Sequence, residues 1–138
     1  DISLGLYQQG YDVVFSCCGN CGLGAFDAVL EAGEGKYVIG VDGNQGEYWK
    51  SIGEDAKAAA TITSMQKNVN NAFLRAAGLH LEGKAPYGAN EKLGLALGGV
   101  SFSVTDATKA ILGDDVIAEI EKAQADIVSG AIAVDTAF

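Results

Sequence analysis

The chain has 138 residues, a length that suits one domain of ordinary size. Of these residues 49% are hydrophobic, 20% are charged and one is proline, which is the composition of a folded domain rather than of a disordered segment. Eighteen acidic residues against nine basic ones give a formal net charge of −9. This charge disfavours nucleic acid and anionic membrane surfaces as partners.

The first ten residues have the pattern of a helix end, with Gly10 as the C-cap. We therefore expect residues 1–138 to be a single α/β ligand-binding lobe, cut from a longer protein. A charged start followed by an apolar stretch, which marks an export signal, is absent from this sequence. No apolar run approaches the roughly 20 residues that span a bilayer.

Residues 12–42 predict one complete βαβ unit. The apolar run at 12–17 is typical of a buried strand, and glycines and then apolar residues at helical spacing follow it. A second buried strand is predicted at 37–42. The crossover between these two parallel strands should be right-handed.

Strands and helices continue to alternate through the rest of the chain. In order, the pattern predicts a loop at 43–57, a strand at 58–63, a helix capped by Ser64, a strand region at 92–104, helices that begin at Asp106 and Asp114, and a last strand at 132–134. The predicted fold is α/β, a three-layer Rossmann-like domain with a mainly parallel sheet.

Ligands of open parallel sheets bind beyond the carboxyl ends of the strands. Asp42 closes the second predicted strand, where a carboxylate can accept two hydrogen bonds from a vicinal diol such as a ribose. The competing interpretation of Asp42 is a local turn with Gly43, which the local pattern favours.

The glycine-rich turn after the first strand contains Gly19, Asn20 and Gly22. Such a turn at the start of a helix presents backbone N–H groups to an anion or to the polar edge of a ligand. Glycines also occur in tight turns for steric reasons alone, and the pattern by itself favours that explanation.

Lys67 follows Ser64 by three residues, so its charge opposes the dipole of the helix that Ser64 is predicted to cap. That placement hints at a partner beyond the helix, although most such lysines are only solvated.

The three cysteines, Cys17, Cys18 and Cys21, lie within five residues and do not form a disulfide framework. Cys18-x-x-Cys21 stands where thioredoxin-like proteins carry their redox motif, so a thiol redox module is one alternative function. Packing of small apolar thiols in a tight turn is another explanation. With only three cysteines, and the single histidine, His80, far away, we predict no metal site.

The sequence shows no recognisable set of catalytic residues. It has neither a pair of carboxylates at a spacing typical of acid–base catalysis nor a nucleophile placed near His80. We therefore predict a binding protein rather than an enzyme, with no cofactor.

Several segments together resemble the C-terminal lobe of the basic membrane lipoprotein family, the nucleoside-binding lipoproteins of bacterial ABC importers. They are residues 10–15, 19–24, 37–45, 62–69, 98–100 and 127–132. The specific ones are Gly-Val-Asp-x-x-Gln at 40–45 and Thr-Ser-Met-x-Lys-Asn-Val at 63–69.

The resemblance implies one lobe of a type I periplasmic-binding-protein fold, in a bilobed lipoprotein that is extracytoplasmic and membrane-attached and delivers its ligand to an ABC permease. In that family the residue matching Asp42 holds ribose hydroxyls, the glycine turn lines the cleft, and the residue matching Lys67 reaches towards the ligand. The implied ligand is a purine nucleoside or, as in some members, riboflavin. Asn20, Cys21 and the long segment 46–57 depart from the family pattern.

Two further expectations concern an alternative function and the association of the chain with itself. The departures around the cleft leave open a regulatory domain that has lost the ligand. An exposed sheet edge could also drive self-association of the chain.

Overall fold

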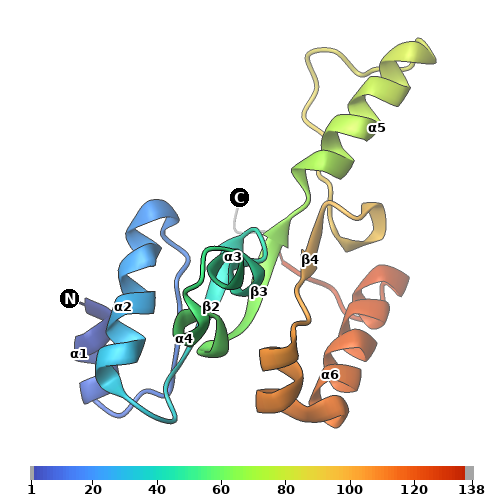
Figure 1. Cartoon of the computed structure of the whole chain (residues 1–138). Coiled ribbons are helices and arrows are strands. Elements are labelled where there is room, and N and C mark those ends of the chain that lie inside the picture. The colour runs from blue at the N-terminus through green and yellow to red at the C-terminus, as the bar shows by residue number, and fades with distance from the viewer. Residues whose placement is uncertain (1, 136–138) are drawn as a thin grey trace.

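The computed structural model describes residues 2–135, and these build a four-stranded sheet in the order β1-β2-β3-β4 (Figure 1). The strands are β1 (Val13–Phe15), β2 (Tyr37–Asp42), β3 (Thr61–Lys67) and β4 (Val100–Phe102). β1, β2 and β3 are parallel, whereas β4 is antiparallel to β3. The predicted α/β class with a mainly parallel sheet is confirmed.

Helices precede, connect and follow the strands. They are α1 (Ile2–Gln8), α2 (Leu23–Ala32), α3 (Gln45–Ser51), α4 (Asp55–Ala59), α5 (Val69–Leu81) and α6 (Asp106–Ser129), with short 3-10 helices η1 (Gly19–Gly22) and η2 (Leu95–Leu97). Within the described residues, no helix combines the length and the apolar character needed to cross a membrane.

Helices lie on both faces of the sheet. Ser64 of β3 contacts Gln45 at the start of α3, so α3 covers the face to which Ser64 points. Met65 points to the opposite face, because successive side chains of a strand alternate. There Met65 lines an apolar groove with Ile120 and Ile127 of α6. The sheet is thus sandwiched between helices, as in the three-layer arrangement expected for the fold.

The buried core lies between α1, α2, α3 and the first two strands. Phe26 and Val29 are the large apolar side chains that α2 buries, and Val38 of β2 is fully buried against the same cluster. The Phe26 and Trp49 rings pack with centroids 5.2 Å apart. Each such side chain stabilises the fold by roughly 1.5–3 kcal/mol through removal of apolar surface from water.

The prediction of a loop at 43–57 was wrong, because this segment folds into α3 and α4. Asn44 caps α3 by accepting a hydrogen bond from the Glu47 backbone N–H, 3.2 Å. Trp49 is only 7% exposed and anchors the helix in the core. A single buried aromatic residue therefore orders a segment whose composition is polar.

Ser64 does not cap a helix, and the prediction that it does was wrong. It is fully buried inside β3, and its Oγ accepts a hydrogen bond from the Gln45 backbone N–H at 3.1 Å. β3 continues to Lys67, and α5 begins after Asn68. Lys67 is therefore the last residue of a strand and not part of a helix.

Other boundaries also differ from expectation. The strand region at 92–104 is reduced to β4, and residues 132–134 form no strand. The two helices predicted from Asp106 and Asp114 are present as the two parts of α6, which meet at Gly113, where φ is 74°. Thr105 caps the first part through a reciprocal pair of hydrogen bonds with Thr108.

Burial raises the pKa of Tyr7 from 10.0 to about 12. The folded state therefore holds this proton more tightly than the unfolded chain does, and the resulting stability is present below pH 10 and lost as the pH rises to about 12. We expect the free energy of unfolding to fall by about 2–3 kcal/mol from this residue across that interval. Urea denaturation at several alkaline pH values measures this fall in the free energy of unfolding. The Tyr7→Phe variant should show a shallower decline, and an identical decline would contradict the assignment to Tyr7.

Candidate functional site

The candidate site lies at the edge of the sheet where β1, β2 and β3 end. Because these strands are parallel neighbours, their carboxyl ends share one edge. Asp42 closes β2 opposite Gln66 of β3, so Lys67 follows one position further along the edge. The Lys67 Nζ and Asp42 Oδ1 atoms are 2.7 Å apart. The structure thus brings together two of the predicted site residues, although Lys67 comes from a strand.

The backbone directs the Asp42 side chain outwards. Its φ is 71°, a left-handed conformation that aspartate tolerates better than most residues at a cost of about 1 kcal/mol. The Gly43 N–H donates to the Val41 carbonyl at 2.9 Å, not to the Asp42 carboxylate. The carboxylate pairs instead with Lys67, and both side chains remain more than half exposed, at 54% and 60%.

The ion pair shifts the titration of the lysine. The hydrogen bond from Lys67 to the Asp42 carboxylate, and then the charge of that carboxylate, raise the pKa of Lys67, with a smaller contribution from Cys17. An exposed pair of this kind contributes little to folding stability because water screens it. Both groups are therefore accessible to a ligand that could replace the contact between them.

The glycine turn divides into exposed and packed parts. Gly19 and Asn20 are exposed in η1, and Gly19 has a φ of 58°. Gly22 is buried, and a Cβ at this position would lie 2.8 Å from the Ser16 carbonyl oxygen. Packing against Ser16 therefore explains Gly22, whereas Gly19 and Asn20 are available at the surface.

The cysteines lie on the same loop. Cys17, Cys18 and Cys21 are free and exposed. Within the described part of the chain, no three His, Cys, Asp or Glu side chains are grouped so that they could hold a metal ion. His80 lies on α5, where its Nδ1 contacts the Tyr87 hydroxyl.

Sequence reasoning missed the buried contacts that hold this edge together. A Cβ on Gly40 would lie 2.5 Å from Gln45 Oε1 and 2.6 Å from Ser64 Oγ. Gly40 therefore lets β2, β3 and the start of α3 approach closely. A glycine inside a strand is the sequence signal for such an approach. Ser103 adds to this cluster, since its Oγ accepts from the Ser64 backbone N–H at 2.9 Å.

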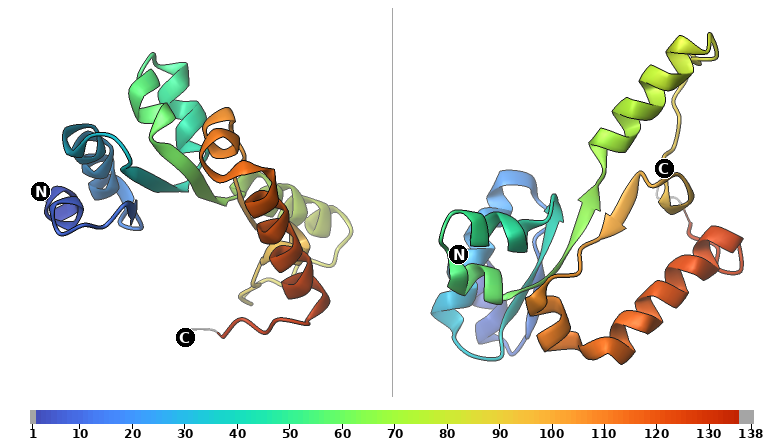
Figure 2. Two further views of the ribbon diagram at one scale, coloured as in Figure 1. Left: turned by 90° about the horizontal axis from the view of Figure 1, so that it is seen from below. Right: turned by 45° about the vertical axis from the view of Figure 1, so that its right-hand side comes forward.

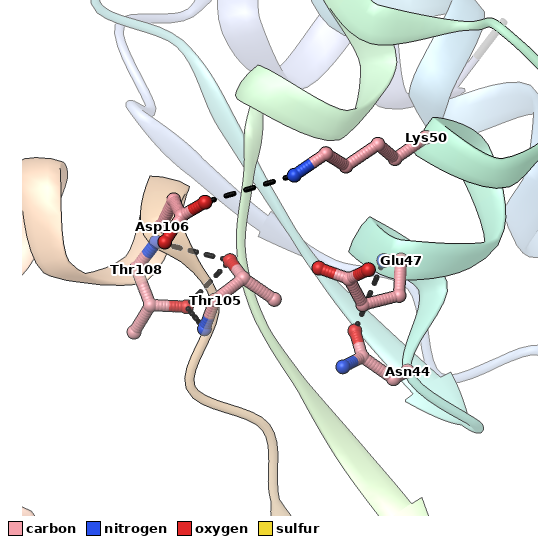
Figure 3. Close-up of polar contacts among 6 residues, drawn as sticks. All are labelled: Asn44, Glu47, Lys50, Thr105, Asp106 and Thr108. Carbon is pink, nitrogen blue, oxygen red and sulfur yellow. Dashed lines mark hydrogen bonds and ion pairs between the residues drawn. The ribbon is translucent and has the colours of Figure 1, made fainter.

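A second concave surface, of about 280 Å³, lies between α3, α4 and the start of α6. Figure 3 shows Lys50 reaching across it to Asp106, 3.6 Å away, beside the capping contacts of Asn44 and Thr105. Ala58 and Ala59, which precede β3, line it. This groove therefore lies apart from Asp42 and Lys67, and the Lys50–Asp106 ion pair crosses it.

A family profile described as ABC transporter substrate-binding protein, PnrA-like (Bmp), matches residues 1–137. The chain belongs to this family, which confirms the resemblance seen in the sequence. The family consists of substrate-binding proteins and is not an enzyme class.

Individual relatives agree with the family. The chain is 32% identical over 142 aligned positions to the "ABC transporter nucleoside-binding protein BmpA" of Lactococcus lactis subsp. cremoris, with 96% of this chain and 38% of that protein covered. It is 42% identical over 40 residues to "Basic membrane protein A1" of Borrelia garinii subsp. bavariensis, with 29% of this chain and 12% of that protein covered.

Two solved structures share the fold. A solute-binding protein of an ABC transporter system from Aeropyrum pernix K1 superposes with a TM-score of 0.73 at 23% identity, over 98% of this chain and 43% of that one. A solute-binding protein from Conexibacter woesei gives a TM-score of 0.68 at 18% identity, over 96% and 40%. The chain thus spans about two fifths of the relatives that it matches along its length.

The Asp42→Asn variant should lower the pKa of Lys67 towards its ordinary value, because the raising influence is the hydrogen bond to the carboxylate. NMR titration of the lysine side chains measures this change. Asp126→Asn is the matched control, since Asp126 raises the pKa of Lys122 in the same way. It should lower the pKa of Lys122 and leave Lys67 unaffected. A Lys67 pKa that does not move in Asp42→Asn would show that the pair is not formed in solution.

Proposed function

We propose that this chain is the solute-binding lobe of an ABC importer and that it binds a purine nucleoside or a similar sugar-bearing molecule through Asp42 and Lys67. The observation that carries the proposal is the exposed Asp42–Lys67 pair at the carboxyl edge of parallel strands. Membership of a substrate-binding family supports the class of function. The description of the Lactococcus relative as nucleoside-binding supports the ligand.

The chemistry of the pair suits a neutral polyol. The Asp42 carboxylate only accepts hydrogen bonds, so it can hold two adjacent hydroxyl groups, and the Lys67 ammonium only donates, so it can serve a hydroxyl or ring acceptor. The two charges cancel, and a neutral ligand therefore leaves no charge uncompensated. Gly19 and Asn20, exposed on the neighbouring turn, are placed to add contacts from the end of β1.

A companion lobe of the same protein would complete the site. α5 starts two residues after Lys67, extends away from the sheet (Figure 2) and has no buried residue. Its most exposed apolar side chains are Val69, Phe73, Leu74 and Leu81. Its other side is tied to the loop that follows it by the Arg75–Glu91 ion pair, 2.5 Å. The relatives contain more than twice the length of this chain, enough for a second lobe that packs on α5 and overhangs the edge.

In the longer protein, this lobe would operate outside the cytoplasm as part of a membrane-attached lipoprotein and would hand its ligand to an ABC permease. These statements extend the family assignment to the whole protein. The thiol redox alternative, taken as the principal function, finds no support in the family or in the relatives.

The first test is calorimetry of the longer protein with a panel of nucleosides and riboflavin. Asp42→Asn should weaken nucleoside binding about 10- to 100-fold, because a hydrogen bond to a charged group contributes about 1.5–3 kcal/mol. Asparagine tolerates the left-handed backbone, so the fold should be retained. Asp126→Asn, on the remote α6, should leave affinity unchanged. Unchanged affinity in Asp42→Asn would exclude Asp42 from the site. A protein that binds nothing in the panel would instead support the regulatory alternative.

The second test concerns the companion lobe. Phe73 is 73% exposed, so Phe73→Asp should change the stability of the 138-residue chain by less than about 0.5 kcal/mol. In the longer protein the same change should cost about 2 kcal/mol or more, because it would place a charge in an apolar interface. Thermal denaturation of both lengths measures the contrast. Asn90→Asp, which adds the same charge on the exposed loop, should have little effect in either. Equal effects of Phe73→Asp at both lengths would contradict docking on α5.

The chain on its own has an open sheet edge at β1, where Val13 and Phe15 are 41% and 50% exposed. We expect weak self-association through this edge at high concentration, measurable by light scattering, and its reduction in Phe15→Lys. A monomer at every concentration would remove this suggestion.

A further inference from the structure

The proposed site makes no use of the thiols that lie beside it. Cys17, Cys18 and Cys21 follow β1 at the same edge of the sheet as Asp42 and Lys67, and all three are free and exposed. These three thiols lie within five residues and are open to small reagents, because exposure is one condition for the reaction of a thiol. β1 and β2 are neighbouring parallel strands, so the loop with the cysteines leaves the sheet beside the end of β2.

The local backbone places Cys18 and Cys21 at the two ends of one turn. Cys18 is the N-cap of η1 and Cys21 lies inside it. Cys18 has a φ of −142° and a ψ of 32°, so the chain turns between Cys18 and the 3-10 helix that contains Cys21. Residues at the two ends of a single tight turn have Cα atoms close enough for the separation of about 4.4–6.8 Å that a disulfide requires. Cys17 and Cys18 are neighbours whose Cα atoms are about 3.8 Å apart, which is too short.

The turn is also held in place at both ends. The Cys18 N–H donates to the Ser16 carbonyl at 2.9 Å, and Gly22 packs directly on the same Ser16. Gly19, with its φ of 58°, allows the chain to turn sharply between the two cysteines. These contacts fix the backbone on either side of the two cysteines.

We propose that Cys18 and Cys21 are a reversible dithiol site that reacts with low-molecular-weight disulfides of the glutathione disulfide type. This goes beyond ligand binding and does not depend on it. Cys17 takes no part in this pair and remains a thiol when the small disulfide is supplied at one equivalent.

The reaction balances as two thiol–disulfide exchanges. The thiolate of one cysteine attacks the small disulfide, the S–S bond of that molecule breaks, and one small thiolate leaves and takes up a proton. The thiolate of the second cysteine then attacks the sulfur of the first, forms the Cys18–Cys21 bond and releases the other small thiol. The protein dithiol loses two electrons and two protons, and the disulfide gains them. Excess thiol reverses both steps.

The test uses the folded 138-residue chain and one equivalent of glutathione disulfide, so that the exposed Cys17 is not capped by excess reagent. Thiol titration should fall from the three thiols of the reduced chain to one, and peptide mass mapping should locate the bond between Cys18 and Cys21. Dithiothreitol should restore all three. A bond that includes Cys17, or a chain that keeps its three thiols, would overturn the proposal.

Two variants distinguish the first thiol–disulfide exchange from the second. Cys17→Ser is the matched control and should lose both remaining thiols as the wild type does. Cys21→Ser should stop at a mixed disulfide on Cys18, seen as the added mass of one glutathione. The second exchange should be at least about tenfold faster in the folded chain than in urea, because the turn holds the thiols together. Equal rates would show that the fold contributes nothing, and would overturn the structural basis of the proposal.

Discussion

The close parallel pairing of β2 with β3 is the constraint on which the candidate site depends. Gly40 faces Ser64 across this pair, and the absence of a Cβ allows Gln45 to reach in from the start of α3. The contact fixes the register of both strands, so Asp42 and Lys67 meet at the carboxyl edge. It also fixes the start of α3, whose Trp49 completes the core. The register of β2 and β3, the position of α3 and the Asp42–Lys67 ion pair therefore all depend on the close contact at Gly40.

Stability and binding use different parts of the molecule. The buried core lies between α1, α2, α3 and the sheet, whereas the charged pair at the edge stays exposed and contributes little to folding. α5 buries none of its residues and leaves the body of the fold at the same edge. A helix with exposed apolar side chains therefore lies next to an accessible ion pair. Such an arrangement suits a lobe that encloses its ligand against a second lobe.

The loop after β1 carries exposed side chains on a backbone that is fixed by packing. Its cysteines border the proposed site without belonging to it, and Gly22 has a packing role against Ser16. A loop that is anchored at both ends and exposed in the middle can vary in its chemistry without disturbing the sheet. Asn20 and Cys21 lie in the exposed middle of the loop.

The sequence by itself determined the α/β class, the bounds of β2 and the positions of Asp42 and Lys67 along the chain, because a continuous apolar run and a strand-ending carboxylate are local signals. Only the tertiary structure decided that Ser64 is a buried strand residue and that residues 43–57 form helices. A serine before an apolar stretch looks the same as a helix cap or as part of a strand, and the choice depends on Gln45 and Ser103, which contact it from elsewhere in the chain. Trp49 likewise orders α3 only because Phe26 and Val38 surround it in the folded state.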